Sequence, residues 1–181
     1  RPVPGPGQTI VTEADFVPAQ NALGGFVYAG ATMAYTAAYW ALHALRPKVI
    51  AVYGCDMHYP ASGPTHFYGA GTPDPLRADI TLRSLEATSV RLMVMAAAQG
   101  CAMVNLSDAP PRLWFPRGTR EAAALARPLT FDPAKVAAAL NREAELGYFA
   151  PSGRYWEDLS RYDVAQIDAL DALWLAVAQD L

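Results

Sequence analysis

Two segments of the chain share one order of elements, a helix followed by a short apolar strand, and this repeat constrains the fold most strongly. The alanine-rich segment 32–45 contains no glycine or proline and predicts a helix. The apolar residues of segment 79–99 recur at helical spacing. The nearly continuous apolar segments that follow, 48–53 and 101–106, predict buried parallel strands. We therefore expect an α/β fold, a Rossmann-like parallel sheet flanked by helices.

The length and composition of the chain predict a single α/β domain. With 181 residues, 52% of them hydrophobic and 17% charged, the chain can bury one sizeable core. Prolines in residues 1–7 predict an extended arm. Short strands expected at 8–14 and 26–28 complete a Rossmann-like core over 8–128, and the remainder, 129–181, is expected to be helical. Because the chain opens on Arg rather than Met, we expect that a first βα unit can lie upstream.

Two helices are expected in the C-terminal part. Segment 132–146 begins with Asp132 as the N-cap residue and ends before Gly147, a residue that commonly terminates helices. Segment 161–181 carries an apolar stripe that includes Trp174. Such a stripe packs either on its own domain or on a second copy of the chain. We expect intramolecular packing and keep a homo-oligomer through this helix as the alternative.

The charge of the chain excludes some classes of partner. A net charge of −3 and a pI near 5.5 provide no long-range attraction to nucleic acid or to anionic lipid, which leaves small ligands or proteins. The sequence shows neither a secretory signal pattern nor an apolar run long enough to cross a bilayer, so we expect a cytoplasmic protein. Cys55 and Cys101 lack the spacing of a metal site or a redox motif and are expected to be structural.

A polar cluster follows the first apolar strand, in the run YGCDMHYPASGPTHFYGAG at residues 53–71. Asp56, His58 and His66 come after the carboxyl end of that strand. In open α/β sheets this edge forms a crevice in which ligands bind. These side chains also supply oxygen and nitrogen ligands for a metal, but their spacing is not that of a zinc site, and we predict no metal centre.

Three stretches of the chain carry a resemblance to a known group: GATMAYTAAYWALHALRPKVIAVYGCDM, THFYG and DITLRSLEATSVRLMVMAAAQGCAMVNLS. Over residues 28–107 the chain resembles the C-terminal half of bacterial sialyltransferase-like glycosyltransferases. It is also similar to the related motility-associated glycosyltransferase-like and pterin pyrophosphokinase-like proteins. The resemblance rests on short motifs rather than on close identity. It implies a Rossmann-like fold and a nucleotide-sugar donor as substrate, with no separate cofactor.

The resemblance implies roles for the residues that match its motifs. A turn of small residues, Gly30, Ala31 and Thr32, would meet the phosphates of the nucleotide, since N–H groups at a helix N-terminus accommodate phosphate oxygens. His66, followed by Phe-Tyr-Gly, would act as the catalytic acid or base, and Asp56 would orient it or the acceptor. The other expected nucleotide- or substrate-binding residues are Gly54, His58, Tyr59, Tyr68, Gly69, Asn105 and Ser107.

The chain departs from that group at two places. The sialyltransferase-like enzymes carry a second histidine shortly after the first, where this chain has Ala70 and Gly71. They also begin with a nucleotide loop that contains Gly and Asn on the first strand, which this sequence does not show. Both departures bear on whether transferase activity is retained, so two further hypotheses stay open.

The first alternative is a pyrophosphokinase-like phosphotransferase, which would bind a nucleoside triphosphate through magnesium. Its metal ligands would be Asp56 together with Asp74 or Asp79. The second alternative is a non-catalytic Rossmann-like interaction module, which would contact other proteins through the helix of Trp174 and the loop of Trp114.

Overall fold

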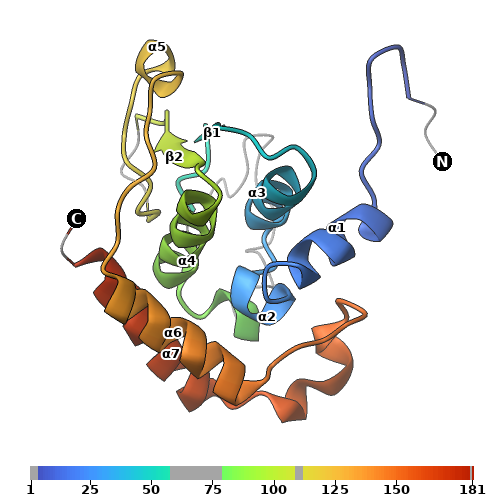
Figure 1. Ribbon diagram of the computed structural model, residues 1–181. Helices are drawn as coiled ribbons and strands as arrows, with labels where there is room; N and C mark the ends of the chain where they lie inside the picture. Colours follow the sequence, from blue (N-terminus) through green and yellow to red (C-terminus); the bar gives the residue numbers. More distant parts are fainter. Residues whose placement is uncertain (1–3, 58–78, 109–111, 180) are drawn as a thin grey trace, which may run out of the picture.

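The computed structural model describes the chain over residues 4–57, 79–108, 112–179 and 181 (Figure 1). Helices account for 54% of the described residues and strands for 6%. The sheet within these residues has two strands, β1 (Val49–Val52) and β2 (Ala102–Asn105). The expected Rossmann-like α/β fold is therefore wrong. The described part of the chain is a helical assembly that contains one parallel strand pair.

The strand pair confirms the two strands predicted after the two helical segments. β1 and β2 run parallel, with Val49 opposite Ala102 and Val52 opposite Asn105. β2 is buried along its whole length, whereas β1 is partly exposed. The chain passes from β1 to β2 through the helix α4 (Leu85–Ala98), which packs against β2. Two parallel strands require such a crossover connection.

The first element is a helix, which corrects the strand expected at 8–14. α1 (Glu13–Asn21) follows Thr12, whose backbone N–H donates a hydrogen bond to Asp15 Oδ2 over 2.8 Å. This reciprocal contact between the N-cap residue and the third helical residue favours a helix start. An acidic residue at this position is the local signal that outweighs the β-branched character of the preceding residues.

The second element also differs from the prediction of a strand at 26–28. The short helix α2 (Phe26–Ala29) lies between Gly25, with φ of 89°, and Gly30, with φ of 79°. A short apolar run between glycines fits a strand or a buried helical turn, because its length gives no periodicity that separates the two. The positive φ angles of Gly25 and Gly30 turn the backbone away from an extended conformation at both ends of α2, so this segment does not continue as a strand.

The two long helices predicted before the strands are present. α3 (Met33–Ala44) confirms the helix expected over 32–45. The helix expected over 79–99 is divided, because a short 3₁₀ turn, η2 (Ile80–Leu82), precedes α4. Ser84 begins α4, since its Oγ accepts a hydrogen bond from the backbone of the first turn.

The C-terminal part contains the two predicted helices. α6 (Pro133–Leu146) ends at Gly147, whose φ of 60° is the left-handed conformation that terminates helices. α7 (Val164–Ala178) packs along α6 at the base of the molecule (Figure 1). Two shorter elements lie in the connecting segments: α5 (Arg120–Ala123) and η3 (Tyr155–Arg161).

The core is organised around α4, which lies between α3 and the α6–α7 pair, with the strand pair near its C-terminal end (Figure 1). Ten of its fourteen residues are buried. The apolar stripe of α7 enters the same core through Ile167, Leu170, Trp174 and Val177. This stripe therefore packs on its own chain. No helix in the described residues combines the length and apolarity needed to span a bilayer.

Candidate functional site

The carboxyl ends of β1 and β2 bring together three of the residues expected to bind a nucleotide. The Gly54 N–H donates to Ser107 Oγ over 2.8 Å, and the Ser107 N–H donates to Asn105 Oδ1 over 2.8 Å. Because the strands are parallel, both ends meet at one edge. Gly54 adopts a φ of 68°, which turns the chain immediately after β1.

Asn105 is the most unusual residue of this edge. Its side chain is only 1% exposed, and its Nδ2 has no hydrogen-bond partner within the described part of the chain. The orientation of the amide follows from the Ser107 N–H, which needs the oxygen rather than the nitrogen opposite it. A buried donor without a partner costs about 1–3 kcal/mol, so this group favours a ligand that supplies an acceptor.

Charged residues flank the same edge. The Arg112 N–H donates to the Asp56 carbonyl oxygen over 3.1 Å, which places Asp56 next to the loop that follows β2. The Arg112 guanidinium forms two hydrogen bonds with Glu86, at 2.7 and 3.1 Å. Partial burial opposes ionisation of Glu86, but the hydrogen bonds from Arg112 lower its pKa overall. The backbone of Arg117 forms an isolated parallel bridge with Asn105, and its guanidinium adds a second cation, because Nη1 donates to the Asp108 carbonyl oxygen over 3.1 Å.

Several predicted site residues fall outside the described residues. The proposed catalytic His66 is among them, so the pairing of His66 with Asp56 is not addressed by the described geometry. The remaining ones are His58, Tyr59, Tyr68, Gly69 and Asp74.

The small-residue turn expected to hold phosphate has another structural explanation. Gly30 follows the helix α2 rather than a strand, and a Cβ there would lie 2.8 Å from Thr88 Cγ2. The Ala31 N–H donates to Thr81 Oγ1, and Thr32 Oγ1 accepts the N-terminal hydrogen bond of α3. Close packing and helix capping thus account for the glycine and the threonine at this turn.

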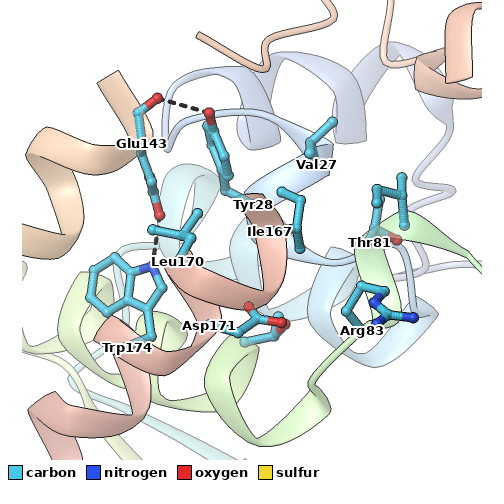
Figure 2. Close-up of a pocket in the computed structure, with 11 residues that line it drawn as sticks. Val27, Tyr28, Thr81, Arg83, Glu143, Ile167, Leu170, Asp171 and Trp174 are labelled. Atoms are coloured by element: carbon cyan, nitrogen blue, oxygen red, sulfur yellow. Dashed lines mark hydrogen bonds between the residues drawn. The ribbon is translucent and has the colours of Figure 1, made fainter. Parts of the chain in front are cut away.

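A buried ionic cluster that the sequence analysis did not identify lies at the centre of the helices. Arg91 on α4 donates to both carboxylate oxygens of Glu143 on α6, at 2.6 and 2.9 Å. Its remaining hydrogen bonds reach Tyr39 Oη and the Leu23 carbonyl oxygen, both at 2.7 Å. The Trp174 indole N–H donates to Glu143 Oε1 over 2.9 Å (Figure 2). We call Arg91, Glu143, Tyr39, Leu23 and Trp174 the ionic cluster.

The ionic cluster is closed to solvent and held from several sides. The Arg91 and Glu143 side chains are 1% and 7% exposed. Burial opposes the charged form of Arg91, yet Glu143 and Tyr39 raise its pKa above the ordinary value. Tyr28 donates to the Glu143 carbonyl oxygen over 2.8 Å and accepts the Tyr148 N–H, and burial raises the pKa of Tyr28 to about 12. Every group is satisfied, which indicates a structural role.

The sequence held one signal for this cluster. Arg91 lies in the middle of α4 among apolar residues, on a helix of which most residues are buried. A buried arginine requires a carboxylate, and Glu143 is the acidic residue of α6 that is buried. The partner was not predictable from spacing, because 52 residues separate the two in sequence.

A small cavity beside the ionic cluster places Asp171 of α7 near Arg83 and Thr81 (Figure 2). Its volume of about 10 Å³ corresponds to one water molecule and is too small for a substrate. Burial and the neighbouring Asp168 raise the pKa of Asp171 to about 7, against the opposing effects of Arg83 and the Ser84 backbone N–H.

Asp79, a candidate magnesium ligand, is engaged with protein groups. Its Oδ1 accepts hydrogen bonds from the Thr81 N–H and hydroxyl, both at 2.7 Å, and its Oδ2 accepts from Tyr155 Oη at 2.6 Å. The described residues contain no group of three or more His, Cys, Asp or Glu side chains arranged to hold a metal ion. No known protein family, curated protein or solved structure matches the chain.

Proposed function

We propose that the chain is a glycosyltransferase-like protein that binds a nucleotide-sugar donor at the carboxyl edge of the β1–β2 pair. The observation that carries the proposal is the Asn105 amide, a buried donor whose Nδ2 lacks a partner among the described residues. The great majority of buried donors in proteins have a hydrogen-bond partner. The unpaired Asn105 donor at the carboxyl edge of the β1–β2 pair supports the proposal, because a ligand acceptor would complete its hydrogen bonds.

The chemistry around Asn105 suits a nucleotide. An amide N–H pairs well with the carbonyl or ring nitrogen of a base and with a ribose hydroxyl, and the Ser107 hydroxyl lies next to it. The Arg117 guanidinium lies beside the segment that follows β2, where its Nη1 donates to the Asp108 carbonyl oxygen over 3.1 Å, and guanidinium groups attract phosphate. The Arg112 guanidinium is already paired with Glu86. This combination of neutral donors with nearby positive charge favours an anionic nucleotide over a cationic ligand.

The proposal is tested by thermal unfolding in the presence of CMP, UDP or GDP, each with and without magnesium. A nucleotide present at a hundred times its Kd stabilises the folded state by about 2.7 kcal/mol. For a chain of this size we expect the Tm to rise by roughly 5–10 °C with one of these nucleotides and without a need for magnesium.

A matched pair of variants assigns the site. Asn105→Ala removes the unpaired amide and is expected to abolish the nucleotide-dependent rise in Tm. Asn141→Ala removes an amide from the exposed face of α6 and is expected to retain the full rise. Equal loss in both variants, or no loss in either, would contradict the assignment to the strand edge.

Turnover distinguishes the proposal from its alternatives. Release of the nucleotide from a nucleotide-sugar is expected for the intact chain and is expected to be lost in His66→Ala, with nucleotide binding retained. Protection by ATP that depends on magnesium would favour the phosphotransferase. Indifference of the Tm to every nucleotide and nucleotide-sugar would contradict the proposal and favour an interaction module.

A further inference from the structure

A second concavity opens between α1, the start of α3 and η3, and it shares no lining residue with the strand edge. Its volume is about 430 Å³, within the range of small-molecule sites. Apolar side chains form most of its wall, because each of four elements contributes one large group. These groups are Phe16 from α1, Phe26 from α2, Met33 from α3 and Trp156 from η3.

Two of these four apolar side chains are exposed to solvent, and one of the two is held by a neighbouring ring. Met33 and Trp156 are 67% and 57% exposed, which is unusual for such large apolar side chains at a concave surface. The Trp156 ring packs edge-on against Tyr155, with the ring centroids 5.3 Å apart and the planes at 81°. Tyr155 is in turn anchored by its hydrogen bond to Asp79 Oδ2 at 2.6 Å. The contact with Tyr155 therefore holds the Trp156 indole in place, while more than half of the Trp156 surface stays exposed to solvent.

Among the described residues that line this concavity, the two charged ones are both acidic. Asp79 lies in its wall, and three hydrogen bonds from Thr81 and Tyr155 fix the orientation of its carboxylate. Glu13 lies at the same concavity but also faces Arg154, at 3.7 Å. No lysine or arginine is among the described residues that line it. Asp79 thus gives the apolar concavity a negative end.

We infer that this concavity binds a small aromatic molecule that carries a positively charged nitrogen. Its ring stacks on the Trp156 indole between the phenylalanine side chains, and its cation faces Asp79. An indole offers a large flat surface for ring stacking, and a carboxylate at the end of an apolar wall selects the charged group. The inference does not depend on nucleotide binding at the strand edge.

Three compounds with the same ring and different charge test the inference. Protonated 2-phenylethylamine, neutral 2-phenylethanol and the phenylacetate anion are titrated into the full chain labelled with ¹⁵N, and the indole N–H signal of Trp156 is followed. The cation is expected to bind roughly fivefold more tightly than the neutral compound, because only its ammonium group gains from the Asp79 carboxylate, as one exposed ion pair provides. The anion is expected to bind least.

Three variants assign the contacts. Trp156→Ala is expected to abolish binding of the cation. Trp114→Ala removes a tryptophan of similar exposure, 40%, from a different surface and is expected to leave binding unchanged. Asp79→Asn is expected to retain 2-phenylethanol binding and to lose the preference for the cation, provided that the remaining NMR signals confirm an unchanged fold.

The opposite results overturn the inference. Equal affinity for the three compounds would contradict the role of Asp79. Failure of all three compounds to bind would contradict the existence of the site. Equal loss of binding in Trp114→Ala and Trp156→Ala would show that neither indole is specific. Each of these outcomes leaves the nucleotide test at Asn105 unaffected, so the two proposals fail separately.

Discussion

The ionic cluster and the carboxyl edge of the strand pair both bury polar side chains, but they satisfy them differently. Arg91 makes four hydrogen bonds, and Glu143 receives a further bond from Trp174. At the edge, Asn105 is equally buried, yet its Nδ2 has no partner among the described residues. Burial alone therefore does not separate a structural polar group from a binding group.

The two regions differ in how completely these polar groups are hydrogen-bonded. Gln20 Oε1 and Asn21 Oδ1 on α1 are two further buried acceptors without a partner among the described residues. A buried charged pair with complete hydrogen bonds stabilises the structure against loss of either member, because removal of one member leaves the other charge unpaired in an apolar interior. A neutral amide whose N–H donor has no partner adds little to the free energy of unfolding, and that donor is left to bond a ligand. The four predictions below test this distinction, from the largest expected change in stability to the smallest.

Removal of one charge from the ionic cluster is expected to have the largest effect. Arg91→Met leaves the Glu143 carboxylate buried without its cation and should lower the free energy of unfolding by about 3–5 kcal/mol, measured by urea denaturation. The double variant Arg91→Met with Glu143→Met should lose less than the single one, because no charge remains buried. A loss larger in the double variant would contradict this account.

The backbone beside Arg91 is expected to be the next most sensitive position. Gly24 has a φ of 103°, and a Cβ there would lie 2.4 Å from Arg91 Nη2. Gly24→Ala should therefore destabilise the protein by roughly 2–4 kcal/mol through backbone strain and displacement of the guanidinium. Gly100→Ala is the control, because its φ is also positive, at 72°, but nothing lies within 4 Å. Equal losses in the two variants would show that the contact with Arg91 does not matter.

Asp171 on α7 lies beside the ionic cluster, partly buried and near charges of both signs. Its folded-state pKa of about 7 lies above the ordinary value of 3.8, so the stability it contributes is present at low pH and is lost as the pH rises toward 7. Arg83, Asp168 and Glu86 are the charged groups that act on it.

The stability of Asp171→Asn relative to the wild type should therefore increase as the pH rises from 3.5 to 8, by on the order of 1–2 kcal/mol. Glu121→Gln, which alters an exposed acid on α5, is the control and should show no such dependence on pH. Parallel stability curves for Asp171→Asn and the wild type over this pH range would contradict the prediction.

The smallest change is expected at the strand edge. Asn105→Ala loses the hydrogen bond from the Ser107 N–H but also removes the unpaired Nδ2, so the free energy of unfolding should change by less than about 1 kcal/mol. Urea denaturation without ligand provides the measurement. A loss comparable to that of Arg91→Met would place Asn105 among the structural groups and weaken the proposed nucleotide site.

The sequence predicted the parts of the fold that have a long or clear pattern. The helices over 32–45 and 132–146 and the strands over 48–53 and 101–106 carry enough apolar residues for their period to be recognised. The run at 26–28 was too short for that distinction and is helical. The α/β assignment came from the alternation of these helices and strands. The structure keeps the two strands but has helices where strands were expected near the N-terminus, so the described residues are mostly helical.

The candidate site was predictable only in part. Gly54, Asn105 and Ser107 follow two predicted parallel strands, so their meeting at one edge could be anticipated from topology. The unpaired state of the Asn105 amide could not, because it depends on atoms contributed by distant segments. The same limit applies to Arg91 and Glu143, whose contact exists only in the packed structure.

The long-range bonds of the ionic cluster also determine when the chain can fold. Arg91 is separated by 68 residues from Leu23 and by 52 from Glu143, and Tyr28 is separated by 115 from Glu143. Contacts of such sequence separation form late and slow the folding reaction. During synthesis, Arg91 leaves the ribosome 52 residues before Glu143, its carboxylate partner. The complete ionic cluster therefore forms only after α6 has been synthesised.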